Sequence, residues 1–392
     1  MNNKHPSLFK KLTRGINIQI GKPLESDLIV IDGVNYEYLK KILPKDYSVT
    51  IIKQRPQVFF ISFEVIYKLI LIFLKKRLKH ISIKKRLKQS YYESLILTLN
   101  PKAVVTLIDN NQTFNYLSKK IKSIPFIAVQ NGLRHPFEGS ANSFHVQHYF
   151  SFGQNEKTYY SNYNMEVENY YPSGSLLNSI FSKKNTKKED KEYDILIVSC
   201  WRGNIGYSKD VEDSMESMRI ADNLMSKYLS NRNLKAAIIL RSERNGDHWF
   251  MPEVGLTEEQ YFKSIYKKDV KIIDVDFKKR NIYELINKSD LILSGFGTTT
   301  LLEAYGSGKK ILYTIFCDDN KYHEIFDSSI LCTNSEWKYF KNRLDEIISI
   351  DNGRYLSDHK KNMNFYMSQP KKGTLKYIKN KLNEIILNNS KN

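Results

Sequence analysis

Short apolar runs alternate with segments of helical periodicity along most of the chain. Four runs in the first half are five or six residues long and rich in aliphatic side chains: residues 27–32, 47–52, 103–108 and 125–129. Runs of this length and composition are typical of buried parallel strands. Helical patterns at residues 36–43 and 114–121 separate them, and a further short strand is expected at residues 149–152. The alternation predicts a parallel, doubly wound α/β sheet.

The same alternation restarts after a polar segment, residues 182–192, whose charged side chains show no periodicity and which predicts a linker. Further strands are expected at residues 193–198, 236–240, 270–275, 290–293 and 310–313. We therefore predict an α/β protein with two Rossmann-like domains that face each other across a cleft, as the 392-residue length also favours. The expected divisions are residues 1–181 (first domain), 182–192 (linker), 193–370 (second domain) and 371–392 (a C-terminal helix).

One segment of the first domain departs from this pattern. Residues 58–74 are strongly apolar but contain Glu64 and Lys68, so the stretch is too short and too charged for a membrane span of about 20 apolar residues. The net charge is +19, and residues 53–88 contain eleven Lys or Arg against one acid. An apolar helix followed by a basic one predicts that residues 58–88 face an anionic membrane surface. The alternative is a core helix with a solvated basic end.

Cysteine content and the N-terminal sequence bear on the compartment. The three cysteines (Cys200, Cys317 and Cys332) are odd in number and show no CxxC spacing, which argues against a disulfide framework. The first twenty residues lack the apolar core of a signal peptide. We expect a cytoplasmic protein that is peripheral at the inner face of the cell membrane.

The most informative chemistry lies in a Gly- and Thr-rich stretch between the strand at 290–293 and a helix. Glycines allow close approach to a phosphate, and a helix N-terminus offers free N–H groups and the positive end of a dipole. This stretch predicts a site for the donor nucleotide, in which Glu303 accepts hydrogen bonds from the ribose hydroxyls. The predicted donor-binding residues here are Gly297, Thr298, Thr299, Thr300 and Glu303. The alternative is a capped strand–helix turn in which Glu303 stabilises the dipole; neither a Walker A loop nor a GxGxxG fingerprint is present.

The residues that follow carry a family resemblance. The pattern from Glu303-Ala304 to Gly308-Lys309-Lys310 resembles the donor half of GT-B glycosyltransferases. In the first half, stretches 106–114, 127–134, 150–153 and 172–175 run in the order seen in bacterial surface-carbohydrate (capsule and O-antigen) biosynthesis proteins, similar to Kdo and nonulosonic acid transferases. This resemblance implies a nucleotide-sugar donor, with a CMP-linked keto-acid sugar as one option. It also implies a metal-independent enzyme without a cofactor.

Candidate acceptor and catalytic groups follow the strands of the first half, because ligands collect at the carboxyl ends of parallel strands. The predicted acceptor-binding residues are Asn110, Gln130, Asn131 and Arg134. Glycosyl transfer needs a base or a nucleophile. Asp109 is the first candidate, with Glu138 and His135 in reserve. The alternative for Asp109 is an Asx turn or a helix cap.

Two arginines of the second half complete the predicted site. Arg202 and Arg241 each follow a strand and could balance the phosphate of the leaving group, since Arg suits bidentate phosphate contacts. The alternative for Arg202 is a surface salt bridge. The acidic cluster at residues 318–324 is interpreted as a solvated loop, and no metal site is predicted.

These features together predict a glycosyltransferase that moves a sugar from a nucleotide sugar to a glycan or lipid-linked acceptor in capsule or lipopolysaccharide O-antigen biosynthesis. One alternative is a polyol-phosphate transferase of the teichoic-acid type, although its usual His-Gly acceptor motif is not evident. Another is a non-catalytic protein that binds polyanions or membranes. A nucleic-acid partner is not expected, because the basic segment lacks interleaved aromatic residues.

Overall fold

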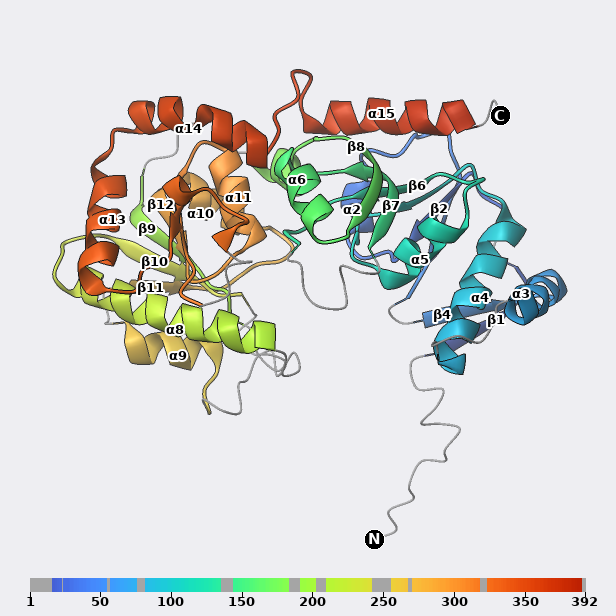
Figure 1. Cartoon of the computed structure of the whole chain (residues 1–392), viewed down its shortest axis with the longest axis horizontal. Helices are drawn as coiled ribbons and strands as arrows, with labels where there is room; N and C mark the ends of the chain where they lie inside the picture. The colour runs from blue at the N-terminus through green and yellow to red at the C-terminus, as the bar shows by residue number, and fades with distance from the viewer. Residues whose placement is uncertain are drawn as a thin grey trace, which may run out of the picture.

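The computed structural model contains two parallel six-stranded sheets, each in its own α/β layer structure (Figure 1). The residues described are 16–22, 24–54, 57–75, 82–134, 144–182, 191–201, 209–241, 255–266, 270–317 and 323–389. Both sheets are fully parallel. The fold class predicted from the hydrophobic pattern is confirmed.

The first sheet has the order β3-β2-β5-β6-β7-β8. Its strands are β2 (Leu28–Ile31), β3 (Val49–Ile52), β5 (Ala103–Thr106), β6 (Phe126–Val129), β7 (His145–Phe150) and β8 (Glu166–Tyr170). Every residue of β2, β5 and β6 is buried, as expected for strands covered on both faces. Strand β8 was not predicted, because its sequence EVENY is polar and largely exposed at the sheet edge.

The helices around the first sheet are α2 (Tyr36–Leu39), α4 (Ile83–Leu99), α5 (Gln112–Lys120), α6 (Asn155–Asn162) and α7 (Leu176–Phe181). Three of these helices, α4, α5 and α7, begin at a side-chain cap. The side chain of Asn111 accepts hydrogen bonds from the N–H groups of Thr113 and Phe114 at the start of α5. Such caps satisfy N–H groups that have no partner within the helix. The strand-end residue Asn111 is therefore fixed by the helix it starts.

The second sheet has the order β11-β10-β9-β12-β13-β14. Its strands are β9 (Tyr193–Val198), β10 (Ala236–Ile239), β11 (Val270–Ile273), β12 (Ser289–Ser294), β13 (Lys310–Thr314) and β14 (Leu331–Cys332). The helices around it are α8 (Lys209–Ser230), α9 (Glu258–Ile265), α10 (Ile282–Asn287), α11 (Thr299–Gly306), α13 (Trp337–Ser349) and α14 (Asn352–Tyr366), and the short 3₁₀ helix η4 (Ser328–Ile330) precedes β14.

The last helix, α15 (Thr374–Asn389), returns to the first half of the chain and lies along it (Figure 1). Ile378, Leu382 and Ile386 are fully buried in one cluster with Leu28 and Val30 of β2. The end of α14 packs tightly on the first half as well. A Cβ added at Gly153 would collide with the backbone of Phe365 and Tyr366. The end of the chain thus ties the two sheets together.

Residues 58–74 form two elements rather than the single apolar helix that their composition predicts. Residues of β4 (Gln57–Ile61) pair in parallel with β1 (Ile16–Ile20) in a separate two-stranded sheet, and α3 (Phe63–Lys75) follows. The run Val58-Phe-Phe-Ile61 is β-branched and aromatic, which favours a strand once a neighbour supplies backbone partners. Within the described part of the chain, no helix combines the length and the apolar character that crossing a membrane requires.

Candidate functional site

A cavity of about 530 Å³ lies between the two sheets, where the carboxyl ends of their strands meet. The second half contributes the ends of β9, β10, β11 and β12, and the first half contributes Asn110 and the turn from Gly132 to Arg134. Ligands of parallel α/β sheets bind at this edge, because loops and helix N-termini converge there. We call this cavity the interdomain cleft; it brings together most of the predicted donor residues and two of the acceptor residues.

The Gly- and Thr-rich turn lies where its sequence predicts, at the N-terminus of α11. Gly297, Thr298, Thr299 and Thr300 all line the interdomain cleft. The cap residue Thr298 makes no side-chain cap hydrogen bond, and its buried Oγ1 has no hydrogen-bond partner among the residues that the structure describes. Buried polar atoms are usually paired, so a hydroxyl left open beside the positive end of a helix points to a ligand.

A hydrogen bond joins this turn to the first half of the chain. The backbone N–H of Leu133 donates to Oγ1 of Thr299 over 2.8 Å. The contact brings the turn that carries Arg134 against the N-terminus of α11. An anion at this helix end would therefore meet groups from both halves.

Among the described residues that line the interdomain cleft, three are arginines, Arg134, Arg241 and Arg280, and one is an acid, Asp276. The guanidinium of Arg241 donates to the carbonyl oxygen of Trp201 over 2.9 Å. Arg280 donates from its NH2 group to Asn35 over 3.2 Å, and its buried Nε has no hydrogen-bond partner in the described ranges. The predominantly positive lining suits phosphate groups.

Arg280 is a site residue that the sequence pattern did not single out. It lies in the turn after β11, with a left-handed backbone (φ 54°). Its only sequence signal is its position after a predicted strand end in the second half.

Asp109, the first candidate for catalysis, is fully buried and does not line the cleft. Its Oδ2 accepts hydrogen bonds from Nε of Arg134 at 2.9 Å and from the hydroxyl of Tyr149 at 2.8 Å. Its Oδ1 accepts from the NH2 group of Arg134. Burial opposes the charge of Arg134, but the Asp109 carboxylate outweighs this effect and raises the pKa of the guanidinium. This geometry favours Asp109 as the residue that positions Arg134; its role as a base stays a prediction.

The predicted acceptor residues separate into two groups. Asn110 and Arg134 both line the cleft, and Asn110 is exposed. Gln130 is buried, donates to Glu156 over 3.1 Å and accepts from the N–H of Phe152 over 2.6 Å. The side-chain oxygen of Asn131 accepts from Arg134. Gln130 and Asn131 thus hold the loop in shape, and neither is among the lining residues of the cleft.

Glu303 lies away from the cleft, between the two halves. Its carboxylate accepts hydrogen bonds from the hydroxyl of Ser175, at the start of α7, and from that of Tyr283 at 3.1 Å. Burial raises the pKa of Glu303 to about 7, although both hydroxyls and the charge of Arg280 act in the opposite direction. Glu303 is absent from the lining of the cleft, so its predicted contact with a ribose stays a prediction.

Three predicted site residues, His135, Glu138 and Arg202, lie outside the described residues. Within the ranges that the structure describes, no group of three His, Cys, Asp or Glu side chains is arranged to hold a metal ion.

Known structures share this fold at low sequence identity. No family model matches the chain, and no curated protein matches it. A glycosyltransferase from Rickettsia africae is similar with a TM-score of 0.51 and 12% identity, covering 96% of this chain and 99% of that one. A UDP-N-acetylglucosamine 2-epimerase from Rickettsia bellii is similar with a TM-score of 0.52 and 12% identity, covering 92% and 95%. The chain therefore has a GT-B-like fold of two parallel sheets.

Proposed function

We propose that this protein is a glycosyltransferase that binds a nucleotide sugar in the interdomain cleft and transfers the sugar to a glycan of the bacterial surface, such as capsule or O-antigen. The observation that carries the proposal is the N-terminus of α11, where Thr298 and Arg280 line one cavity and each has a buried polar atom without a hydrogen-bond partner among the described residues. A fixed set of donors at a helix N-terminus suits the phosphates of a nucleotide. The fold alone is shared with enzymes of more than one activity.

In this proposal each cleft residue has a role that its position allows. Thr298 and the N–H groups of α11 bind a phosphate of the donor, and Arg280 and Arg241 offset the negative charge that develops on the leaving nucleotide. Arg134, held by Asp109, faces the sugar from the first half. Asn110 lies at the rim, where an acceptor hydroxyl would approach. The base that takes the acceptor proton is still expected among Asp109, His135 and Glu138.

Nucleotide binding tests this proposal. The thermal unfolding of the protein should be measured against CMP, CDP, UDP and GDP. A nucleotide present at about 100 times its Kd stabilises the folded state by about 2.7 kcal/mol, which raises the melting temperature measurably. A shift with one nucleotide supports the proposal and identifies the donor, and CMP would indicate a keto-acid sugar. If none of the four nucleotides raises the melting temperature, the proposal is contradicted and the polyanion-binding alternative is favoured.

We further propose that the protein works at an anionic membrane surface, which it contacts through α3. Six apolar residues of this helix recur at helical spacing and are all exposed: Phe63, Ile66, Tyr67, Ile70, Leu71 and Leu74. Such a stripe normally faces a core, but here Phe63 is 88% and Leu74 is 71% exposed. The exposed lysines 75, 84, 85 and 88 follow on α3 and α4. Apolar residues flanked by lysines match the acyl chains and the anionic headgroups of a membrane.

The membrane contact predicts salt-sensitive binding to vesicles that contain phosphatidylglycerol. The double substitution Ile70→Asp/Leu74→Asp should weaken this binding at least tenfold, because it places charges on the face that enters the membrane. The control is Leu356→Asp/Phe365→Asp, which changes two exposed apolar residues of α14 and should leave binding unchanged. If the α3 variant and the α14 control bind vesicles equally well, the proposed membrane contact is contradicted. It is also contradicted if the wild type forms a stable dimer that the α3 substitutions dissociate.

A further inference from the structure

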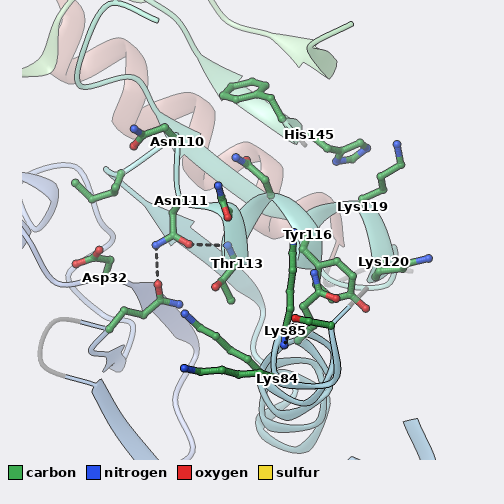
Figure 2. Close-up of a pocket in the computed structure, with 18 residues that line it drawn as sticks. Asp32, Lys84, Lys85, Asn110, Asn111, Thr113, Tyr116, Lys119, Lys120 and His145 are labelled. Carbon is green, nitrogen blue, oxygen red and sulfur yellow. Dashed lines mark hydrogen bonds between the residues drawn. The ribbon is translucent and has the colours of Figure 1, made fainter. Parts of the chain in front are cut away.

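A second cavity, of about 770 Å³, lies in the first half of the chain (Figure 2). It is lined by residues that follow β2, β3 and β5 and by the facing sides of α4 and α5. Asn110 lines both this cavity and the interdomain cleft. A ligand held here would therefore reach the site where we propose that the sugar is transferred. We call this cavity the α4–α5 cavity.

Positive charge dominates the α4–α5 cavity. The described residues that line it include five lysines, Lys84, Lys85 and Lys88 from α4 and Lys119 and Lys120 from α5, and one carboxylate, Asp32. Lys119 pairs with Glu166 at 2.8 Å. The other four form no ion pair with any carboxylate of the described residues. Like charges repel when they are gathered at one site, so an anionic ligand would stabilise this arrangement.

Amide and hydroxyl side chains also line the α4–α5 cavity. Buried Oδ1 of Asn115 and buried Nε2 of Gln54 have no hydrogen-bond partner within the described part of the chain, and the whole Asn115 residue is only 3% exposed. The side-chain oxygen of Gln54 accepts a hydrogen bond from the side-chain amide of Asn111 over 2.8 Å (Figure 2). This bond fixes the direction of the amide N–H group of Gln54. One open acceptor and one open donor suit a hydroxyl-bearing ligand, because a hydroxyl group both donates and accepts.

We propose that the α4–α5 cavity binds the acceptor and that this acceptor is a negatively charged glycan, whose phosphate or carboxylate groups contact the lysines and whose hydroxyls contact Gln54 and Asn115. The proposal rests on the function proposed above and specifies its acceptor. Lysines alone would suit any polyanion, whereas the unpaired amides favour a sugar. The three α4 lysines lie near the start of this helix, which packs against α3, so a glycan attached to a membrane lipid could enter from that side.

Two variants test the α4–α5 cavity. The first is Lys85→Glu/Lys120→Glu, which reverses one charge on each helix; the second is Gln54→Glu, which keeps the oxygen that accepts from Asn111 but removes the free donor. The control is Lys360→Glu/Lys361→Glu on α14, two exposed lysines with the same change of net charge. The probe is a dextran sulfate oligosaccharide in 0.1 M NaCl, with neutral dextran, single-stranded DNA and phosphatidylglycerol vesicles for comparison.

Dextran sulfate should bind more tightly than neutral dextran and DNA, and both cavity variants should weaken its binding about tenfold, a difference of about 1.4 kcal/mol. The control should change binding less than twofold. The proposal would be overturned if the control lost as much dextran sulfate binding as the cavity variants. It would also be overturned if DNA or vesicles bound as tightly as dextran sulfate and their binding were weakened as much by Gln54→Glu. Both cavity variants should keep the wild-type melting shift with nucleotide. A normal nucleotide shift without dextran sulfate binding removes only this inference, whereas absence of the nucleotide shift removes the proposed function itself.

Discussion

Replacing Arg134 by Ala should lower the free energy of unfolding by about 3–5 kcal/mol, because it leaves the Asp109 carboxylate buried without its cation. Asp109 is fully buried, and two of its three side-chain hydrogen bonds come from Arg134. The measurement is urea unfolding at pH 7, with the nucleotide-induced melting shift measured on the same samples. Because Arg134 also lines the interdomain cleft, nucleotide sugar binding or turnover should fall as well.

A double-mutant cycle separates the buried pair from a general loss of packing. Asp109→Asn/Arg134→Ala removes both charges and should be more stable than Arg134→Ala alone, since no unpaired carboxylate remains. If the two variants unfold at the same denaturant concentration, the ion pair does not stabilise the fold as the geometry indicates. Near-normal turnover in Asp109→Asn would further remove Asp109 from the candidates for the base.

Glu303→Gln should stabilise the protein at alkaline pH and have little effect at pH 4.5. The folded-state pKa of Glu303 is raised from 4.5 to about 7 by burial, so folding favours the protonated form. The protonated Glu303 side chain contributes about 3 kcal/mol in total to the free energy of unfolding. This contribution is fully present below pH 4.5 and is lost as the pH rises through 7. The measurement is the free energy of unfolding of both proteins between pH 4.5 and 8.5.

The difference in stability between Glu303→Gln and the wild type should therefore grow across this pH range. Ser175 and Tyr283 can still bond to the amide, because hydroxyl groups donate and accept. A constant difference at every pH would contradict the buried, protonated state of Glu303. Nucleotide affinity should stay within twofold of the wild type, and a tenfold loss would instead support the ribose contact expected from the sequence.

Much of the fold follows from local sequence, because parallel strands covered on both sides must be short aliphatic runs. Residues 28–31, 103–106 and 126–129 meet this condition and are strands. The edge strand β8 is polar and carries no such signal. The apolar run at 58–61 is equally compatible with a helix, and only its pairing with β1 makes it a strand.

The candidate site was predictable where it depends on the ends of strands and not where it depends on contacts across the sheet. Thr298 and Arg241 follow apolar runs and lie in the interdomain cleft. The pairing of Asp109 with Arg134 joins residues 25 positions apart, and that of Glu303 with Ser175 joins residues 128 apart. Neither contact has a signal in local composition. Arg280 depends on a left-handed turn after β11 that the spacing of apolar residues does not indicate.

The measurement that tests the central claim most directly is nucleotide affinity in Thr298→Val. This substitution removes a buried hydroxyl that has no partner, so the melting temperature without ligand should not fall. The matched control is Ser294→Ala, which also removes a buried, unpaired hydroxyl at the end of β12 but does not line the cleft. The nucleotide to use is the one that raises the melting temperature of the wild type. We predict that Thr298→Val lowers the affinity for this nucleotide about tenfold, while Ser294→Ala leaves the affinity unchanged. Equal affinity in all three proteins would contradict nucleotide binding at the N-terminus of α11.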